Sequence, residues 1–325
     1  MSPVDIVYLW VDSADVQWRK RRQHAYADWV AKNPGELAPF GNVAGRYRDN
    51  GELQFNLRAL ENFFPEHGHI YIVTDGQTPR WLQSSSGLTV VDHQDLLPSR
   101  GLGVFDSGHI ESYLHHIDSL SERFFYLNDD VFFGAPVELN DWFGHRLKVF
   151  TEAELLPDYE TMQAHETSLV NASIQSRQWM SARYANYQHE PRVYSHSPRP
   201  ILKSAMYELE QLAPELFAPA RSTSFRSWRI PALVPDLVPR WMVHMGYAEQ
   251  RILNPLHIST GDPHAEQQLL SLRQKFGSLP FFCINDTCDD AFDNDVRLQR
   301  VADTLEALLP APCRFEMAAQ ECVGA

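Results

Sequence analysis

The chain has 325 residues, of which 44% are hydrophobic, so it can bury a large core in one domain or in a core with an insert. Its formal net charge of -14 argues against nucleic acids and anionic membrane surfaces as partners, because both select for clusters of Lys and Arg. The N-terminus has no basic segment followed by a long apolar one, and no apolar run could span a bilayer, so we expect a cytoplasmic protein without a transmembrane segment.

The first third of the chain alternates between strand and helix patterns. Short apolar runs rich in β-branched and aromatic residues predict strands at 5–11, 69–76, 87–93 and 123–129. Helical spacing and possible N-caps predict helices at 16–32, 53–64 and 107–117. This order predicts an α/β fold with a mostly parallel, Rossmann-like sheet.

The rest of the chain divides into two further parts. Residues 152–255 have weak strand signals, many prolines and long helix-compatible stretches, which predict a mainly helical insert covering the active edge of the sheet. A strand at 279–286 and a closing helix at 298–308 follow. We therefore expect a core over 1–151, an insert over 152–255, and a return to the core over 256–325.

Polar residues stand where several predicted strands end. They are Asp12, Thr74-Asp75, Asn128-Asp129-Asp130 and Asn285-Asp286. Because ligands of open α/β sheets bind beyond the carboxyl ends of parallel strands, these side chains should meet at one rim. Their oxygens suit Mg²⁺ or Mn²⁺, which often binds substrate phosphates. For any single Asp, a turn or a helix cap is the alternative, and Asp129 could cap backbone N–H groups.

Cationic and basic residues could act on a phosphate at that rim. Arg46, Arg48 and Arg58 surround one loop–helix junction and could bind phosphate oxygens, or could pair with nearby carboxylates. His196, in a loop fixed by prolines, could be a general base or simply a solvated residue. Arg226 lies between aromatic residues, where stacking is as reasonable as catalysis.

The stretch HIESYLHH offers a further carboxylate. Glu111 and His115 are four residues apart and would share one face of the predicted helix. A zinc pair is conceivable there, although the HExxH pattern is absent. Glu111 could instead be a buried base, an orienting carboxylate or an ordinary surface residue.

Long stretches of the sequence resemble the Stealth family. DIVYLWVDSAD resembles its first signature, with Ser13 where Gly is usual. RYRDNGELQFNLRALENFFPEHGHIYIVTDGQTPRWL, VVDHQDLLP and SGHIESYLHHIDSLSERFFYLNDDVFFG resemble the second. HSPRPI with STSFRSW resembles the third signature, and FFCINDT the fourth, while PAPCRFE resembles the family's usual ending with Cys313 in place of Ser.

The resemblance implies an activity and a set of site residues. The family contains bacterial capsular-polysaccharide phosphotransferases and the catalytic subunit of the GlcNAc-1-phosphotransferase that marks lysosomal enzymes. Its members transfer a hexose 1-phosphate from a UDP-sugar to a sugar hydroxyl and release UMP. Four positions match residues regarded as catalytic in the family: Glu111, Asp130, His196 and Arg226. Donor contacts are expected from Trp10, Asp12, Asp15, Arg46, Arg58 and Asn128, and metal contacts from Asp130, Asp129, Asn285 and Asp286.

In this reading Asp130 holds Mg²⁺ or Mn²⁺ on the donor diphosphate, and Arg226 stabilises charge in the transition state. His196, or alternatively Glu111, takes the proton of an oligosaccharide or polysaccharide acceptor. Two rival functions remain. One is a metal-dependent glycosyltransferase that attacks the anomeric carbon and releases UDP, and the other is a carbohydrate-binding protein without catalytic activity.

Overall fold

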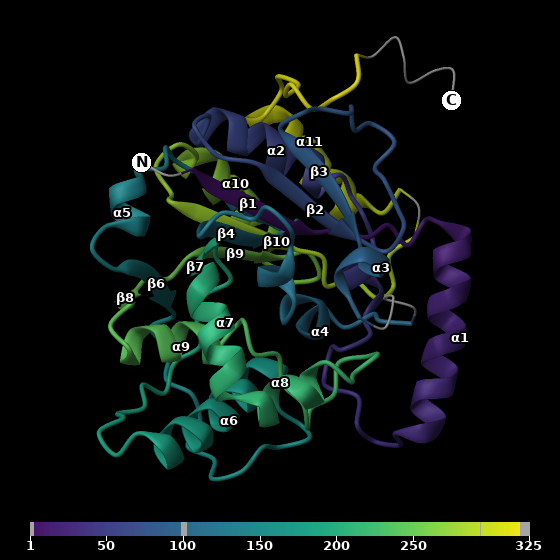
Figure 1. The fold of residues 1–325 in the computed structure, drawn as a ribbon. Coiled ribbons are helices and arrows are strands. Elements are labelled where there is room, and N and C mark those ends of the chain that lie inside the picture. The colour runs from purple at the N-terminus through teal and green to yellow at the C-terminus, as the bar shows by residue number, and fades with distance from the viewer. Residues whose placement is uncertain (1–2, 99–102, 293, 319–325) are drawn as a thin grey trace.

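The computed structural model describes residues 3–98, 103–292 and 294–318, and its centre is a five-stranded sheet (Figure 1). The strand order is β3-β2-β1-β4-β7, in which the first four strands are parallel and β7 pairs antiparallel with β4 at the edge. The prediction of an α/β fold with a mostly parallel sheet is confirmed. The strands are β1 (Val4–Leu9), β2 (Ile70–Thr74), β3 (Leu88–Asp92), β4 (Arg123–Asn128) and β7 (Arg199–Leu202).

The central strands read as continuous apolar runs because both faces of the sheet are covered. Every residue of β1 and β2 is buried. The one charge within β1, Asp5, is satisfied by the backbone N–H groups of His69 and Ser121, each 2.8 Å from its carboxylate. Because β1, β2 and β4 are parallel, the polar residues at their carboxyl ends lie at the same edge of the sheet.

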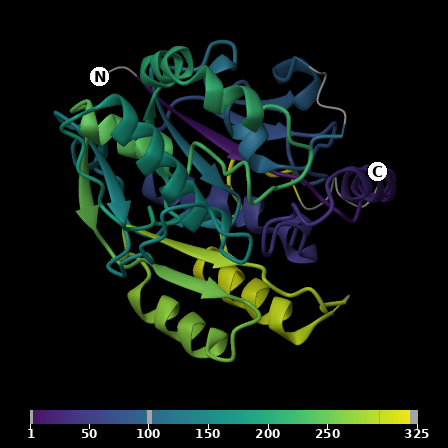
Figure 2. The ribbon, with the colours of Figure 1, turned by 90° about the horizontal axis from the view of Figure 1, so that it is seen from below.

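Helix α2 (Glu52–Phe63) joins this sheet to a second, smaller one. Leu53, Leu57 and Leu60 on one face belong to the main core. Phe55 and Ala59 on another face belong to a separate apolar cluster. That cluster lies on a sheet of order β5-β10-β9, seen with its two covering helices at the bottom of Figure 2. The elements are β5 (Val131–Phe133), β9 (Leu256–Ser259), β10 (Phe281–Asn285), α10 (Ala265–Lys275) and α11 (Val296–Leu308).

The middle of the chain adds helices and a third sheet. Helices α6 to α9 gather on one side of the main sheet, below it in Figure 1. They are α6 (Ser168–Arg183), α7 (Lys203–Leu212), α8 (Pro214–Ala220) and α9 (Leu237–His244). A parallel pair, β6 (Leu147–Thr151) and β8 (Ala248–Ile252), flanks them. Within the described ranges, no helix is long and apolar enough to cross a bilayer.

One expectation about the organisation of the chain needs correction. Residues 152–255 do not form a separate insert, because β7 completes the main sheet and β8 pairs with β6 from the first part. The sequence did not reveal β7 because this strand has only four residues and contains Pro200, which an edge strand tolerates. The late strand β10 pairs with β5 of residues 1–151 and with β9, so it joins the smaller sheet and not the main one.

The helix expected over 107–117 is also shorter than predicted. Helix α4 (Ser107–Glu111) ends at Ser112, whose hydroxyl bonds the carbonyl of His109 at 2.7 Å. Such a side chain competes with helix continuation, and a 3₁₀ turn, η2 (Leu114–His116), follows. The remaining elements are α1 (Val16–Lys32), η1 (Ala44–Tyr47), α3 (His93–Leu96) and α5 (Leu139–Phe143).

Candidate active site

A polar cavity of about 1100 Å³ opens where β4 and β10 end. Its wall combines the polar ends of these strands with residues of α4, η1, the β7 region and the middle segment. Acidic and amide side chains in the wall are Glu52, Glu111, Asn128, Asp129, Asp130, Glu152, Asn285 and Asp286, and the basic ones are Arg46, Arg48, His196, Arg199, Arg226 and His257. The four residues expected to be catalytic, Glu111, Asp130, His196 and Arg226, therefore lie in one cavity.

The buried side-chain amide of Asn56 holds the backbone of the Asn-Asp-Asp turn at the end of β4. Asn56 on α2 is fully buried, and its Nδ2 donates to the carbonyls of Asp129 and Val131 at 3.0 and 2.6 Å. Its Oδ1 accepts from the hydroxyl of Tyr8 on β1 at 2.9 Å. No hydrogen bond links the Asp129 carboxylate to another described residue, so its side chain is not the backbone cap considered as the alternative.

Both carboxylates of this turn sit in a desolvated, acidic setting. Burial raises the pKa of Asp130 to about 6. Burial and the neighbouring charges of Asp130 and Glu52 raise the pKa of Asp129 well above its ordinary value. Asp130 Oδ1 is buried and has no hydrogen-bond partner in the described part of the chain. A cation or a proton at this position would relieve the cost of these charges.

Glu111 stands on the buried end of α4. Its side chain accepts a hydrogen bond from the Tyr126 hydroxyl at 2.8 Å, and burial raises its pKa. Its other oxygen, Oε2, is buried without a partner among the residues that the structure describes. His115 does not share its face, because the helix ends at Glu111, so the conceived zinc pair of Glu111 and His115 is wrong.

His196 stands beside Asp130 and is the most accessible base of the four. Its Nε2 lies 3.8 Å from Asp130 Oδ1, and its Nδ1 lies 3.4 Å from the thiol of Cys283. Burial, with the charge of Arg199 as the next cause, lowers the pKa of His196 well below its ordinary value. The imidazole is therefore neutral at pH 7 and free to accept a proton.

Three arginines present cationic groups to the cavity. Arg226 is positioned by the Ser107 hydroxyl at 2.8 Å and lies 3.9 Å from Asp106. Arg46 and Arg199 have no side-chain hydrogen bond or ion pair within the described ranges. Unpaired guanidinium groups facing a shared cavity suit a ligand with several phosphate oxygens.

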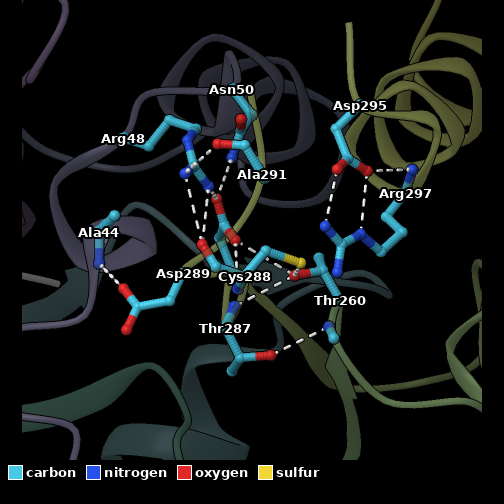
Figure 3. Close-up of polar contacts among 12 residues, drawn as sticks. Ala44, Arg48, Asn50, Thr260, Thr287, Cys288, Asp289, Ala291, Asp295 and Arg297 are labelled. Carbon is cyan, nitrogen blue, oxygen red and sulfur yellow. Dashed lines mark hydrogen bonds and ion pairs between the residues drawn. The ribbon is translucent and has the colours of Figure 1, made fainter. Parts of the chain in front are cut away.

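Asp286 performs a structural task that the sequence did not reveal, and Figure 3 labels its partners Arg48, Asn50, Thr260 and Cys288. Its carboxylate is ion-paired with Arg48 and also accepts from Asn50, Thr260 and the N–H of Cys288. It thereby fastens the segment after β10 to the start of α2. Asp286, like Asn285, lines the cavity, but its carboxylate is already ion-paired with Arg48, so Asp286 is the weakest of the four expected metal ligands.

A second hollow of about 640 Å³ adjoins the cavity, and the two share Arg46, Ser107, Asn128 and Asp129. Trp10 from the end of β1 and Trp18 from α1 form part of its aromatic wall. The indole Nε1 of Trp18 is buried without a partner in the described part of the chain. An aromatic hollow next to a polar cavity that contains arginine side chains suits a nucleoside.

Three of the expected donor contacts lie elsewhere. Asp15 is the N-cap of α1, and Asp12 bonds the N–H of Ala14 at 2.7 Å, so both follow the alternative of a cap or turn. Arg58 lies away from the cavity and makes a two-pronged ion pair with Glu316 at 2.7 and 2.8 Å. Since two faces of α2 are buried, the Arg58 side chain lies against the C-terminal segment. The sequence pattern around the loop–helix junction could not reveal this orientation.

Sequence reasoning missed several residues of the wall. Arg199 is the arginine of the HSPRPI stretch, in which the resemblance points to His196 alone. His257 of the wall pairs in register with the buried Cys283 behind it, so this residue is found only through the pairing of β9 with β10. Glu52 is the first residue of α2, and its burial, which raises its pKa to about 8, depends on the tertiary fold.

The residues present fit a divalent cation. Asp130 has a buried carboxylate oxygen without a partner, and Asp129 faces the same cavity. These hard oxygen donors suit Mg²⁺ or Mn²⁺. Next to Asp130, the ligand atoms of His196, His257 and Cys283 lie within 4.8 Å of one another, a nitrogen and sulfur set that suits softer metals.

Comparison with protein families gives two matches. Residues 46–151 match Stealth protein conserved region 2, and residues 267–322 match conserved region 4. The first match contains Arg46, Glu111 and the Asn-Asp-Asp turn, and the second contains Cys283 and the end of β10. Both matches thus bring residues to the cavity.

Individual relatives extend the similarity over most of the chain. An exopolysaccharide phosphotransferase of Streptomyces coelicolor is 33% identical over 97% of this chain and 52% of its own length. A capsular polysaccharide phosphotransferase of Neisseria meningitidis, LcbA, is 31% identical over 75% of this chain and 66% of its own. The Haemophilus influenzae capsular polysaccharide phosphotransferase fcs1 is 29% identical over 88% of this chain and 78% of its own length. The chain spans about half of the Streptomyces protein. A solved galactosyltransferase, LgtC, covers 95% of this chain and 98% of its own at 9% identity, with a TM-score of 0.40.

Proposed function

Because the chain belongs to the Stealth family, we propose that it transfers a hexose 1-phosphate from a UDP-sugar to a sugar hydroxyl and releases UMP. GlcNAc 1-phosphate is the first candidate for the transferred group. The acceptor would be an oligosaccharide or polysaccharide of a bacterial capsule or exopolysaccharide. Mg²⁺ or Mn²⁺ would be the cofactor.

One observation carries this proposal. A single cavity contains two guanidinium groups that form no direct ion pair within the described ranges, those of Arg46 and Arg199, next to a carboxylate oxygen of Asp130 that has no hydrogen-bond partner there. Cations without partners favour an anionic substrate, and the carboxylate favours a cation that accompanies it. A nucleotide diphosphate bound with a divalent metal supplies both.

The two adjoining hollows suggest how the donor lies. The nucleoside would occupy the aromatic hollow between Trp10 and Trp18, so that Trp18 Nε1 finds an acceptor on the base. The diphosphate would then cross the shared boundary at Arg46 and Asn128, and the sugar would enter the larger cavity. The acceptor would approach from the side formed by Glu152, Tyr194 and other residues of the middle segment.

The reaction forms a bond between the acceptor oxygen and the phosphorus that bears the sugar, while the bond from that phosphorus to the UMP oxygen breaks. His196 takes the proton of the acceptor hydroxyl, and the Asp130 carboxylate 3.8 Å away stabilises the imidazolium that results. Arg199 and Arg226 neutralise the equatorial phosphate oxygens. Asp130 and Asp129 would hold Mg²⁺, which would supply positive charge to stabilise the donor diphosphate and the leaving UMP.

Separation of the nucleotide products tests this proposal. The protein is incubated with UDP-GlcNAc, Mg²⁺ and a panel of oligosaccharide acceptors. Release of UMP that depends on acceptor is expected. UDP would mean attack at the anomeric carbon by a glycosyltransferase. If no tested donor yields a nucleotide and none binds in a metal-dependent way, the chain is a carbohydrate-binding protein and the proposal fails.

A further inference from the structure

A second cluster of metal-ligating side chains lies outside the cavity, where η2 packs against α7. His115 Nε2 is 2.6 Å, and His116 Nε2 is 2.9 Å, from the same oxygen, Oε2 of Glu210. The three ligand atoms lie within 4.8 Å of one another. Two consecutive imidazoles thus converge on one carboxylate oxygen that comes from an element about 95 residues later in the chain.

The protonation of this cluster allows metal binding. Burial lowers the pKa of His115 to about 4, so its imidazole is neutral at pH 7. His115 Nδ1 is buried and has no hydrogen-bond partner among the described residues. The Glu210 carboxylate holds the proton of the free His115 imidazole on Nε2. Because no described group contacts Nδ1, the proton can move there, and Nε2 can then offer its lone pair to an ion.

A second layer of contacts holds the carboxylate in place. Arg221 donates to the other oxygen of Glu210 and to the carbonyl of Ser112 at 2.7 Å. The same guanidinium lies 3.9 Å from the ring centre of Tyr113. Outer partners of this kind orient metal ligands and are part of a working site. Arg221 also balances the carboxylate charge, so the ring nitrogens of the two histidines provide the remaining attraction for a cation.

The cluster has a path to solvent. A surface hollow of about 970 Å³ is lined by His116, Glu210 and Arg221 together with Tyr207. The side chain of His116 is 36% exposed, whereas that of His115 is fully buried. An ion could therefore enter from the hollow, and a water molecule there could complete its coordination.

We propose that His115, His116 and Glu210 form a zinc site with the fourth position open to the surface hollow. Imidazole and carboxylate ligands in this number match zinc, whereas Mg²⁺ prefers oxygen ligands alone. On binding, each imidazole would carry its proton on Nδ1 and would coordinate through Nε2. The ion would tie η2 to α7 and so fix the chain that follows Glu111. This inference does not depend on the proposed reaction.

Zinc titration of the purified full chain, stripped with a chelator, tests the site. We expect one equivalent to bind, and His116→Ala should weaken binding by more than about tenfold. His116 is partly exposed, so this variant should fold, and circular dichroism checks that it does. His165→Ala is the matched control, because His165 is 69% exposed and lies outside the cluster, and it should bind zinc as the wild type does.

Cobalt substitution separates this cluster from the one near Asp130. A cobalt ion at His115, His116 and Glu210 shows no thiolate charge-transfer band, whereas one bound with Cys283 does. Cys283→Ser should leave binding unchanged. The proposal is overturned if no equivalent of zinc binds, if His116→Ala has no effect, or if Cys283→Ser abolishes binding. The first result would make the cluster a hydrogen-bonded network that only joins η2 to α7.

Discussion

The role of His196 rests on its position rather than on its residue type. Its imidazole is neutral, faces the cavity and stands 3.8 Å from the Asp130 carboxylate. Glu111, the other candidate base, is 3% exposed and already bonded to Tyr126. We therefore expect Glu111 to orient rather than to accept the proton.

His196→Ala should lower kcat by about 10²- to 10⁴-fold and change donor affinity much less, because the imidazole acts on the acceptor hydroxyl. Steady-state kinetics with separate donor titrations measures both quantities. A loss confined to donor affinity would make His196 a binding residue and return Glu111 to the role of base.

Replacement of Arg199 should lower donor affinity without lowering the thermal stability of the protein. Desolvation lowers the pKa of Arg199 although the Glu111 charge attracts its guanidinium group, and no carboxylate in the described part of the chain is close enough to form an ion pair with it. Arg199→Gln should therefore leave the thermal stability of the free protein unchanged or higher. Donor affinity should fall roughly 10- to 100-fold, since a hydrogen bond to a charged group is lost.

Differential scanning fluorimetry and donor titration measure the two effects of Arg199→Gln. Arg183→Gln is the control, because Arg183 is exposed and pairs with Glu215 outside the cavity. A marked loss of stability in Arg199→Gln with normal donor affinity would show that Arg199 supports the fold instead.

Glu52 makes the stability of the metal-free protein depend on pH. Burial raises its pKa from 4.5 to about 8, so the folded state holds a proton that the unfolded state releases. Stability from this group is full below pH 4.5 and is lost as pH rises towards 8. Glu52→Gln removes this loss. As pH rises through that window, the free energy of unfolding of the variant should increase relative to that of the wild type by up to about 1.4 kcal/mol per pH unit.

Urea unfolding at several pH values measures the difference between Glu52→Gln and the wild type. Glu66→Gln, at an exposed position, controls for the change of carboxylate to amide. A constant difference between pH 5 and 8 would contradict the raised pKa of Glu52.

At the level of elements, the segment after β10 is fastened to the start of α2. Arg48 and Asn50 bond Asp286, and Gly45 packs so closely that a Cβ there would lie 2.2 Å from the Asp286 carbonyl oxygen. Only glycine therefore fits at this contact. The clamp keeps Asn285 and the rim residues of η1 on the same cavity wall.

Asp286→Asn should cost about 1–3 kcal/mol in the free energy of unfolding, because the ion pair with Arg48 is lost. Mg²⁺ affinity should hardly change, since the carboxylate already serves protein groups. Chemical unfolding and Mg²⁺-dependent donor titration measure the two. Asp289→Asn is the neighbouring control, as Asp289 bonds only the N–H of Ala44 in Figure 3. A large loss of Mg²⁺ affinity with normal stability would instead make Asp286 a metal ligand.

The elements also show how far sequence reasoning reached. The strands of the main sheet up to β4 could be predicted because their apolar runs end at polar residues. Local patterns could not reveal β7, which is short and contains Pro200, nor the pairing of β10 with β5. Glu111, Asp130, His196 and Arg226 were found through motifs, whereas Arg199 and His257 reach the cavity only through strand pairing.

At the scale of the whole molecule, three sheets and the helices of the middle segment meet around one cavity. The formal net charge of the chain is -14, yet the cavity wall carries the guanidinium groups of Arg46 and Arg199, which form no ion pair within the described ranges. An acidic protein can thus bind a diphosphate through local cations and a metal rather than through a broad basic surface. We propose that the polar wall of the middle segment selects the acceptor.

The central claim is that the acceptor attacks phosphorus, and tracing the sugar-bearing phosphate tests it most directly. UDP-GlcNAc labelled with ³²P at that phosphate is incubated with Mg²⁺, acceptor and the protein, and the products are separated. We predict that the label moves to the acceptor in a phosphodiester and that unlabelled UMP leaves. Label recovered in UDP, with sugar on an unlabelled acceptor, would place the attack at the anomeric carbon and contradict the account.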